Sequence, residues 1–195
     1  MIIEIEGIDG VGKTTQVRLL KQFLEENGHH AIIVKDLEST EIGRRIKEIF
    51  ISDSPRDKTV ELFGFLCCKA HLFSEVVAPV AQNGTWVICD RGFGSFISYF
   101  ESCGFERQKL EDMLTVAVPK WRPAMTILLD LSAKEAIRRN IGKPGFSKFD
   151  NMGTNFFTKQ RAVYSDLSSQ SDWRTIDARA SIDDIHQDIC KIVDI

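Results

Sequence analysis

The chain of 195 residues lacks the cysteine spacing of a disulfide framework or a metal site, an excess of basic residues, and a long apolar run. Its five cysteines are odd in number and none shows CxxC spacing, which favours free thiols in a reducing compartment. The formal net charge is −3, whereas general binders of nucleic acid or membrane surfaces usually carry a basic excess. No stretch is long and apolar enough to span a bilayer. We therefore expect a cytoplasmic protein whose partners include neither nucleic acid nor a membrane. A locally basic site for a small anionic ligand stays open.

Short apolar runs alternate with helical patterns along the whole chain. Strands are expected at residues 1–6, 31–34, 85–89, 125–131 and 174–176, and helices at 14–27, 40–51, 58–83, 95–102, 107–118, 132–140, around 155–169 and from 181 onward. This alternation predicts an α/β fold of three layers, with a five-stranded parallel sheet between helices. The chain contains no repeat and no low-complexity linker, so its length predicts a single domain over residues 1–195.

Residues Gly7 to Thr14 match the phosphate-loop pattern G-x-x-x-x-G-K-[ST] in full, between an expected strand and an expected helix. Glycines let the backbone curl so that its N–H groups point at phosphate oxygens, and the helix N-terminus adds partial positive charge. Lys13 is suited to neutralise the β- and γ-phosphates, and the hydroxyl of Thr14 to ligate Mg²⁺. This context disfavours the alternative, a glycine-rich turn with a solvated lysine, and we expect no signal peptide ahead of the first strand. The residues expected to bind ATP are Gly7, Asp9, Gly10, Val11, Gly12, Lys13, Thr14 and Thr15.

A charged pair, Asp90-Arg91, directly follows the third expected strand. Ligands of parallel sheets bind at the carboxyl ends of the strands, where Gly7 to Thr14 and Lys35-Asp36 are also expected. Beside a phosphate loop, we interpret the pair as part of a site rather than as a surface ion pair. Asp90 is suited to hold Mg²⁺ through water, and Arg91 to grip a phosphate with its two-pronged guanidinium.

Together these segments resemble the thymidylate kinase family, and the resemblance spans nearly the whole chain. It is carried by the run Glu6 to Gln16, by Asp90-Arg91 with Ser95 and Tyr99, by Arg122-Pro123 to Asp130, by Phe157, Arg161 and Tyr164 as an F-x-x-x-R-x-x-Y helix, and by Ile176 to Ala178. The resemblance implies a P-loop kinase that transfers the γ-phosphoryl group of ATP to dTMP with the help of Mg²⁺, and that forms a homodimer. The alternatives are a kinase for another nucleotide and a degenerate ATP-binding protein without turnover. A GTPase-type switch would be expected to carry an N-K-x-D motif, which the chain does not contain.

The resemblance also implies roles on the acceptor side. Asp9 is expected between donor and acceptor, Phe65 against the thymine ring, and Tyr99 where the family disfavours a ribose 2′-hydroxyl. Helical spacing puts Phe65 and Lys69 on one face, although an apolar stripe leaves Phe65 open as an ordinary core residue. The residues expected to be catalytic are Lys13, Asp9, Arg91 and Arg139. Those expected to bind the acceptor are Asp9, Lys35, Phe65, Lys69, Arg91, Ser95, Phe96 and Tyr99.

Several acceptor-side positions depart from the family pattern. Lys69 stands where an arginine usually contacts the thymine, and lysine cannot offer the same planar fork. The chain has Lys35-Asp36-Leu37 for the usual R-E-P, Gly92 for a tyrosine, Phe96 for a small or polar residue, and Phe100 for a glutamine. The sequence therefore indicates ATP binding more firmly than it indicates the base of the acceptor.

Residues 138–150 are basic and irregular, and they match the position of the family's lid over ATP. Phosphoryl transfer needs cations around the transferring oxygens and the exclusion of water. The phosphate loop contains no arginine, so we expect this segment to supply a catalytic cation, from Arg139, Lys143 or Lys148. Each of the two lysines fits a solvated basic loop equally well.

Overall fold

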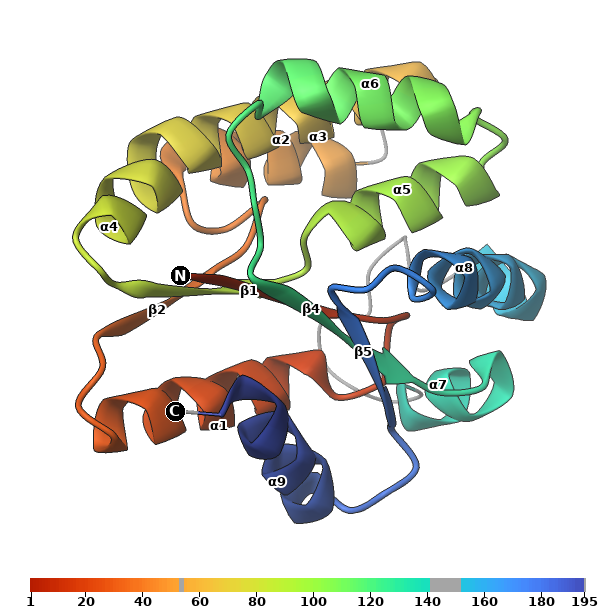
Figure 1. The fold of residues 1–195 in the computed structure, drawn as a ribbon. Coiled ribbons are helices and arrows are strands. Elements are labelled where there is room, and N and C mark those ends of the chain that lie inside the picture. Colours follow the sequence, from red (N-terminus) through yellow and green to blue (C-terminus); the bar gives the residue numbers. More distant parts are fainter. Residues whose placement is uncertain (53–54, 141–151, 195) are drawn as a thin grey trace.

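Helices cover both faces of one parallel sheet in the computed structural model, which describes residues 1–52, 55–140 and 152–194 (Figure 1). The strands are β1 (Ile2–Glu6), β2 (Ala31–Val34), β3 (Trp86–Asp90), β4 (Met125–Asp130) and β5 (Trp173–Asp177). They lie in the order β2-β3-β1-β4-β5, and every neighbouring pair is parallel. The predicted three-layer α/β fold with a five-stranded parallel sheet is confirmed.

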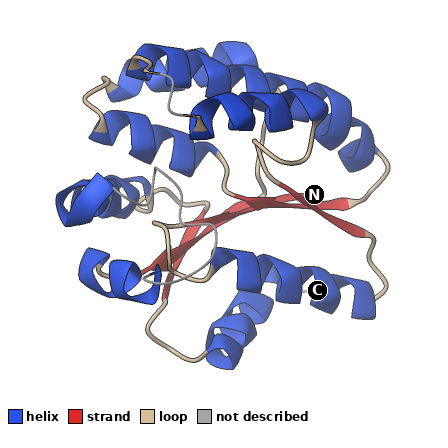
Figure 2. Cartoon of the chain, turned by 180° about the vertical axis from the view of Figure 1, so that it is seen from behind, coloured by secondary structure: helices blue, strands red, loops and turns tan. Residues whose placement is uncertain are grey.

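The helices divide between the two faces of the sheet. Their bounds are α1 (Lys13–Glu26), α2 (Glu41–Ile51), α3 (Lys58–Leu72), α4 (Ala78–Gln82), α5 (Phe93–Ser102), α6 (Arg107–Ala117), α7 (Ala133–Asn140), α8 (Gly153–Leu167) and α9 (Ile182–Val193). Helices α2 to α6 lie on one face and α1, α7 and α9 on the other, while α8 lies beside β5 and packs on α5 and α7 (Figures 1 and 2). This arrangement leaves one end of the sheet, where all strands finish, open to a ligand.

The buried central strands explain this architecture. All five residues of β1 and of β3 are buried, as expected for parallel strands that are covered on both faces. Ile3, Ile5, Ile88, Ile127 and Leu129 are inaccessible or nearly so in the main core, so burial of their side chains drives the helices onto the sheet.

One expected helix differs from the prediction. The pattern predicts a single helix over residues 58–83, whereas α3 and α4 are joined by a π-helical turn, η1 (Phe73–Val77). Pro79 lies near the start of α4, where its missing N–H and fixed φ are tolerated. The prediction was wrong here because apolar periodicity does not register one extra residue in a helical turn.

Helices α2 and α9 begin at caps made by a hydroxyl side chain. Thr40 accepts a hydrogen bond from the N–H of Gly43 at the start of α2, and Ser181 accepts one from Asp184 at the start of α9. Ser181 Oγ also donates to the carboxylate of Asp184 at 2.7 Å. No helix within the described part of the chain is both long and apolar enough to cross a membrane.

Candidate active site

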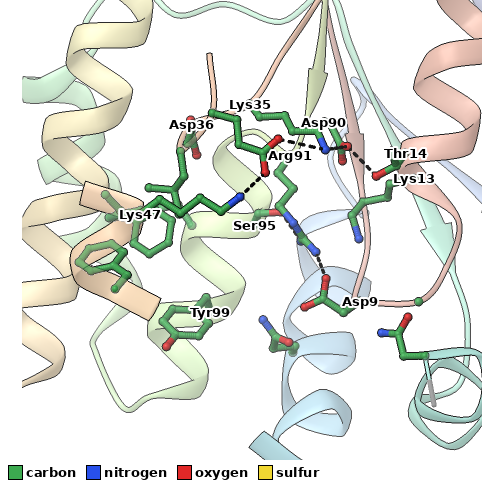
Figure 3. A pocket seen from close by; sticks show the side chains of 18 of the residues that line it. Asp9, Lys13, Thr14, Lys35, Asp36, Lys47, Asp90, Arg91, Ser95 and Tyr99 are labelled. Atoms are coloured by element: carbon green, nitrogen blue, oxygen red, sulfur yellow. Dashed lines mark hydrogen bonds and ion pairs between the residues drawn. The ribbon is translucent and has the colours of Figure 1, made fainter. Parts of the chain in front are cut away.

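A cavity of about 690 Å³ lies at the carboxyl ends of β1, β2 and β3. Most of the residues singled out from the sequence line it, namely Asp9, Gly10, Gly12, Lys13, Thr14, Thr15, Lys35, Phe65, Asp90, Arg91, Ser95, Phe96 and Tyr99. These residues come from segments far apart in the chain and meet because parallel strands end at the same edge of the sheet (Figure 3). Gly7, Val11, Lys69 and Arg139 are not among the lining residues.

The phosphate loop depends on glycine at three places. Gly7, Gly10 and Gly12 all have positive φ, between 91° and 135°. A Cβ at residue 10 would also collide with the carbonyl oxygen of Ala136, so the loop packs too closely on α7 for a side chain. Val11 is buried and anchors the loop on the core, and Gly12 precedes the first residue of α1. The loop is thus shaped as a phosphate-binding turn at a helix N-terminus.

The ammonium of Lys13 is held inside this loop. It donates hydrogen bonds to the carbonyl oxygens of Gly7 at 2.9 Å and Ile8 at 2.8 Å. Burial, with the nearby cation of Arg91 as a second cause, lowers the pKa of Lys13 to about 8. An anion bound in the cavity would oppose both effects, so the site is electrostatically suited to a phosphate.

Thr14, Asp90 and Lys35 form a polar cluster at the ends of β3 and β2. Thr14 Oγ1 donates to Asp90 Oδ2 at 2.9 Å, and Lys35 Nζ lies 3.0 Å from the same oxygen (Figure 3). Burial acts to raise the pKa of Asp90, but the cations Lys13, Arg91 and Lys35 outweigh it and hold the pKa below its usual value. An ionised carboxylate beside a hydroxyl supplies hard oxygen ligands, which fit Mg²⁺ when it is also bound by phosphates.

Arg91 joins the phosphate loop to the start of α5. Its guanidinium pairs with the carboxylate of Asp9, and it donates to Ser95 Oγ at 3.0 Å and to the Gly7 carbonyl at 3.2 Å. Burial acts to raise the pKa of Asp9, but the charges of Arg91 and Lys13 outweigh burial and hold the pKa below its usual value. This carboxyl is therefore ionised at neutral pH. Arg91 and Asp9 therefore lie together beside the loop, where the sequence predicted a meeting of donor and acceptor.

Aromatic rings line the cavity away from the phosphate loop. The ring of Phe65 lies 5.2 Å from that of Phe50, 5.9 Å from Phe100 and 6.4 Å from Tyr99, measured between centroids. The Tyr99 hydroxyl is fixed by Lys58 at 2.6 Å and donates to Glu61 at 2.9 Å. Phe65 is therefore both part of an aromatic cluster and exposed to the cavity, so it can offer a flat apolar face to a base.

Lys69 and Arg139 lie apart from the cavity. The Lys69 ammonium donates to Asp36 Oδ2 at 2.7 Å and to the carbonyl of Gly92 at 2.9 Å, and 2% of its side chain is exposed. Arg139, at the end of α7, donates to the carbonyl of Ala178 at 2.9 Å and pairs with Glu135. Residues 141–150 of the expected lid, which include Lys143 and Lys148, lie outside the described residues.

Sequence reasoning missed several residues of the site. Asp36, Leu37, Phe50, Asn140 and Gln160 also line the cavity, and Gln160 is 7% exposed. Asp36 was expected at the carboxyl end of the second strand together with Lys35, but it was not named among the residues that bind a substrate. Gln160 lies three residues before Val163 and four before Tyr164 on α8, and all three side chains are buried. A polar residue at this spacing from apolar ones was the available signal.

Comparison with known proteins gives one consistent result. A family model described as thymidylate kinase matches residues 5–189. The chain is 34% identical to a probable thymidylate kinase from Pyrococcus abyssi, over 98% of this chain and 94% of that protein. It is 32% identical to a probable thymidylate kinase from Thermococcus onnurineus, over 100% of this chain and 97% of that protein. It is 31% identical to a thymidylate kinase from Fervidobacterium nodosum, over 98% of each chain. A match across the whole sheet, the phosphate loop and the Asp90-Arg91 segment shows that this chain belongs to the thymidylate kinase family.

Proposed function

We propose that this cavity is where the chain carries out its family's reaction, the transfer of the γ-phosphoryl group of ATP to dTMP, which yields ADP and dTDP. The observation that carries the proposal is the meeting of a complete phosphate loop with the Asp9–Arg91 pair in one cavity. The loop suits the donor phosphates, and a guanidinium beside it suits the acceptor phosphate. The aromatic end of the cavity then suits the base.

Catalysis in this arrangement rests on positioning and charge. Lys13 and the backbone N–H groups of the loop bind the β- and γ-phosphates, and Arg91 holds the acceptor phosphate so that one of its oxygens attacks in line. Asp9, which the Arg91 guanidinium keeps ionised, orients that guanidinium between the two substrates. No covalent intermediate with the protein is needed.

Mg²⁺ fits the polar cluster formed by Thr14 and Asp90. The Thr14 hydroxyl and the Asp90 carboxylate are oxygen ligands at the open end of the loop, and Asp90 is ionised. When bound with ATP, the ion supplies positive charge that offsets the charge developing on the phosphate oxygens. We place the protein in the cytoplasm, in keeping with its free cysteines and acidic net charge.

The family also implies a homodimer, and the described helices offer a face for it. Ile49 on α2 and Val60 and Phe63 on α3 are 55%, 55% and 56% exposed. These two helices pack on each other, so the three side chains belong to one layer of the fold. We propose that a second copy covers this face. Light scattering during gel filtration distinguishes a dimer of the chain from a monomer, and Phe63→Glu should shift a dimer towards monomer.

A panel of nucleoside monophosphates tests the function directly. ADP release from ATP is coupled to NADH oxidation, with dTMP, dUMP, dCMP, dGMP and AMP each offered in turn. The proposal expects the highest kcat/KM with dTMP and dependence on Mg²⁺. Turnover with another monophosphate and none with dTMP would assign a different nucleotide kinase. ATP binding without turnover on any acceptor would show a degenerate kinase.

A further inference from the structure

Glu6, at the end of β1, is a completely buried carboxylate directly before the phosphate loop. Taking a charged group out of water is costly unless hydrogen bonds replace its hydration. Glu6 is fully supplied with donors. Oε1 accepts from the N–H groups of Gly92 and Ser95, both at 2.8 Å, and Oε2 accepts from the Tyr164 hydroxyl at 3.0 Å and from the Ser95 hydroxyl.

These bonds give α5 an N-terminal cap from another strand. The first N–H groups of a helix have no partner within the helix, and a side chain at the N-cap usually supplies one. Here the N-cap is Gly92, which has no side chain and makes no such bond. Glu6 replaces it by accepting from the N-cap N–H and from Ser95, three residues later.

The capped turn directly follows Arg91. Arg91 has φ of 84°, in the left-handed region that residues with a side chain rarely adopt. Its guanidinium donates to the Ser95 hydroxyl, which in turn donates to Glu6. Glu6 thus contacts both the backbone that follows Arg91 and the hydroxyl that holds its side chain.

Two glycines leave room for this arrangement. A Cβ at residue 92 would collide with the carboxyl group of Glu4, and a Cβ at residue 94 would lie 2.6 Å from the Trp173 ring and 3.1 Å from Glu6 Oε1. The tyrosine that is usual after the Asp-Arg pair would require the carboxyl group of Glu4 to move away from its present partners. Gly92 is therefore matched to the buried carboxylates of β1.

We propose that Glu6 is a positioning residue, which holds Arg91 in its phosphate-binding geometry through the first turn of α5 and the hydroxyl of Ser95. The proposal rests on the proposed function, because it takes Arg91 as the group that binds the acceptor phosphate. Glu6 itself touches neither substrate, since it is completely buried and does not line the cavity.

Glu6→Gln tests the proposal, because it keeps the size of the side chain but turns one acceptor into a donor and removes the charge. Losing a hydrogen bond to a charged group corresponds to roughly a tenfold to a hundredfold change. We expect the KM for dTMP and the Kd for dTMP, measured by calorimetry without ATP, to rise by about this factor. The KM for ATP should change less than about twofold. Binding of thymidine, which has no phosphate, should be unchanged.

Glu4→Gln is the matched control. Glu4 lies two residues earlier on the same strand and is also buried. It accepts from Trp121 and Thr126 and, at 3.3 Å, from the N–H of Phe93 in the first turn of α5, but none of its hydrogen bonds goes to Ser95 or Arg91. Its dTMP affinity should match that of the natural protein. Equal weakening by both variants, or weaker thymidine binding in Glu6→Gln, would show a general structural role and overturn the proposal.

Ser95→Ala keeps the proposal testable if Glu6→Gln does not fold. It removes the hydroxyl link while leaving both backbone bonds to Glu6, so dTMP binding should weaken and thymidine binding should not. Unchanged dTMP binding in a folded Glu6→Gln or Ser95→Ala protein contradicts the proposal. If the natural protein itself does not phosphorylate dTMP, the proposed function fails instead, and the two failures are thus distinct.

Discussion

Thr14 and Asp90 are joined by a hydrogen bond of 2.9 Å between Oγ1 and Oδ2, although they are 76 residues apart in the chain. The bond connects the first turn of α1 to the end of β3, so it joins the phosphate loop to the Asp90-Arg91 segment (Figure 3). Both residues line the cavity. The site proposed for Mg²⁺ thus draws its two oxygens from the first turn of α1 and the end of β3, which this hydrogen bond joins.

Asp90→Asn should raise the Mg²⁺ concentration needed for half-maximal activity. A neutral amide attracts Mg²⁺ or its bound water more weakly than a carboxylate does, and such a loss costs about tenfold to a hundredfold in metal affinity. The measurement is a Mg²⁺ titration of initial rates at fixed ATP. Glu38→Gln is the control, because Glu38 also faces Lys35, at 3.7 Å, without touching Thr14. An equal shift in both variants would assign the effect to Lys35 rather than to the metal.

Lys13→Ala should lower kcat by at least about a hundredfold while the protein stays folded. The ammonium is the side-chain cation within the loop, and its hydrogen bonds in the structure are to the loop carbonyls of Gly7 and Ile8. The checks are steady-state rates with dTMP and the thermal unfolding midpoint. Near-normal turnover in a folded variant would be incompatible with donor binding at this loop.

Arg91→Ala should raise the KM for dTMP by about tenfold to a hundredfold, through the loss of a charged contact to the acceptor phosphate. ATP affinity should change little. Arg91→Lys keeps the charge without the two-pronged geometry, so its effect should be intermediate. Both constants come from initial rates with one substrate varied at a time. A fall in ATP affinity with unchanged dTMP kinetics would place Arg91 on the donor side.

Between pH 5 and pH 8, the free energy of unfolding should fall less in Glu4→Gln than in the natural chain. Burial, with the charge of Glu6 as a second cause, raises the pKa of Glu4 from 4.5 to about 7. Between these values the folded protein retains a proton that the unfolded chain has released, so stability falls as pH rises. The loss reaches about 3 kcal/mol above pH 7.

Glutamine does not titrate, so the variant should not show this loss. The free energy of unfolding, from urea titrations at pH 5, 6, 7 and 8, should therefore diverge between the two proteins as pH rises. Parallel pH profiles would show that Glu4 does not hold a proton in the folded state.

The sequence predicted the layers, the phosphate loop and the segments around the cavity because each has a local signature. Glycine spacing indicates Gly7 to Thr14, and a charged pair after an apolar run indicates Asp90-Arg91. Because parallel strands end together, these local patterns were enough to predict that distant residues meet.

The carboxylates of β1 were not predicted, because their partners come from the start of α5, from β4 and the segment before it, and from α8. Glu4 and Glu6 are two residues apart and so lie on one face of a strand that is buried on both faces. Two acidic residues on the same face of such a strand were the available signal of a buried polar network. Their hydrogen bonds depend on tertiary contacts between residues up to 158 positions apart, which no local pattern encodes.

The last prediction concerns the base, where the structure changes the role expected of Lys69. Its ammonium is held between Asp36 and the carbonyl of Gly92, whereas Asp36 and Phe65 both line the cavity. Asp36 Oδ2 accepts from Lys69, and its side chain is 12% exposed. A base that stacks on Phe65 therefore meets an acceptor, a carboxylate, rather than a donor.

A carboxylate accepts hydrogen bonds from the N3–H of thymine and also from the N4 amino group of cytosine, so it separates these bases weakly. We expect dTMP to be preferred over dCMP by less than in relatives with an arginine at this position. Asp36→Asn keeps an oxygen for Lys69 but replaces the acceptor that faces the base with a donor, so it should lower kcat/KM for dTMP and dCMP alike, by up to about tenfold, the value of one hydrogen bond. Lys69→Arg should leave the ratio between dTMP and dCMP nearly unchanged. The measurement is kcat/KM for dTMP, dUMP, dCMP and dGMP on all three proteins. If Lys69→Arg sharpens the preference for dTMP and Asp36→Asn leaves both values unchanged, residue 69 reads the base directly, as the family resemblance implied.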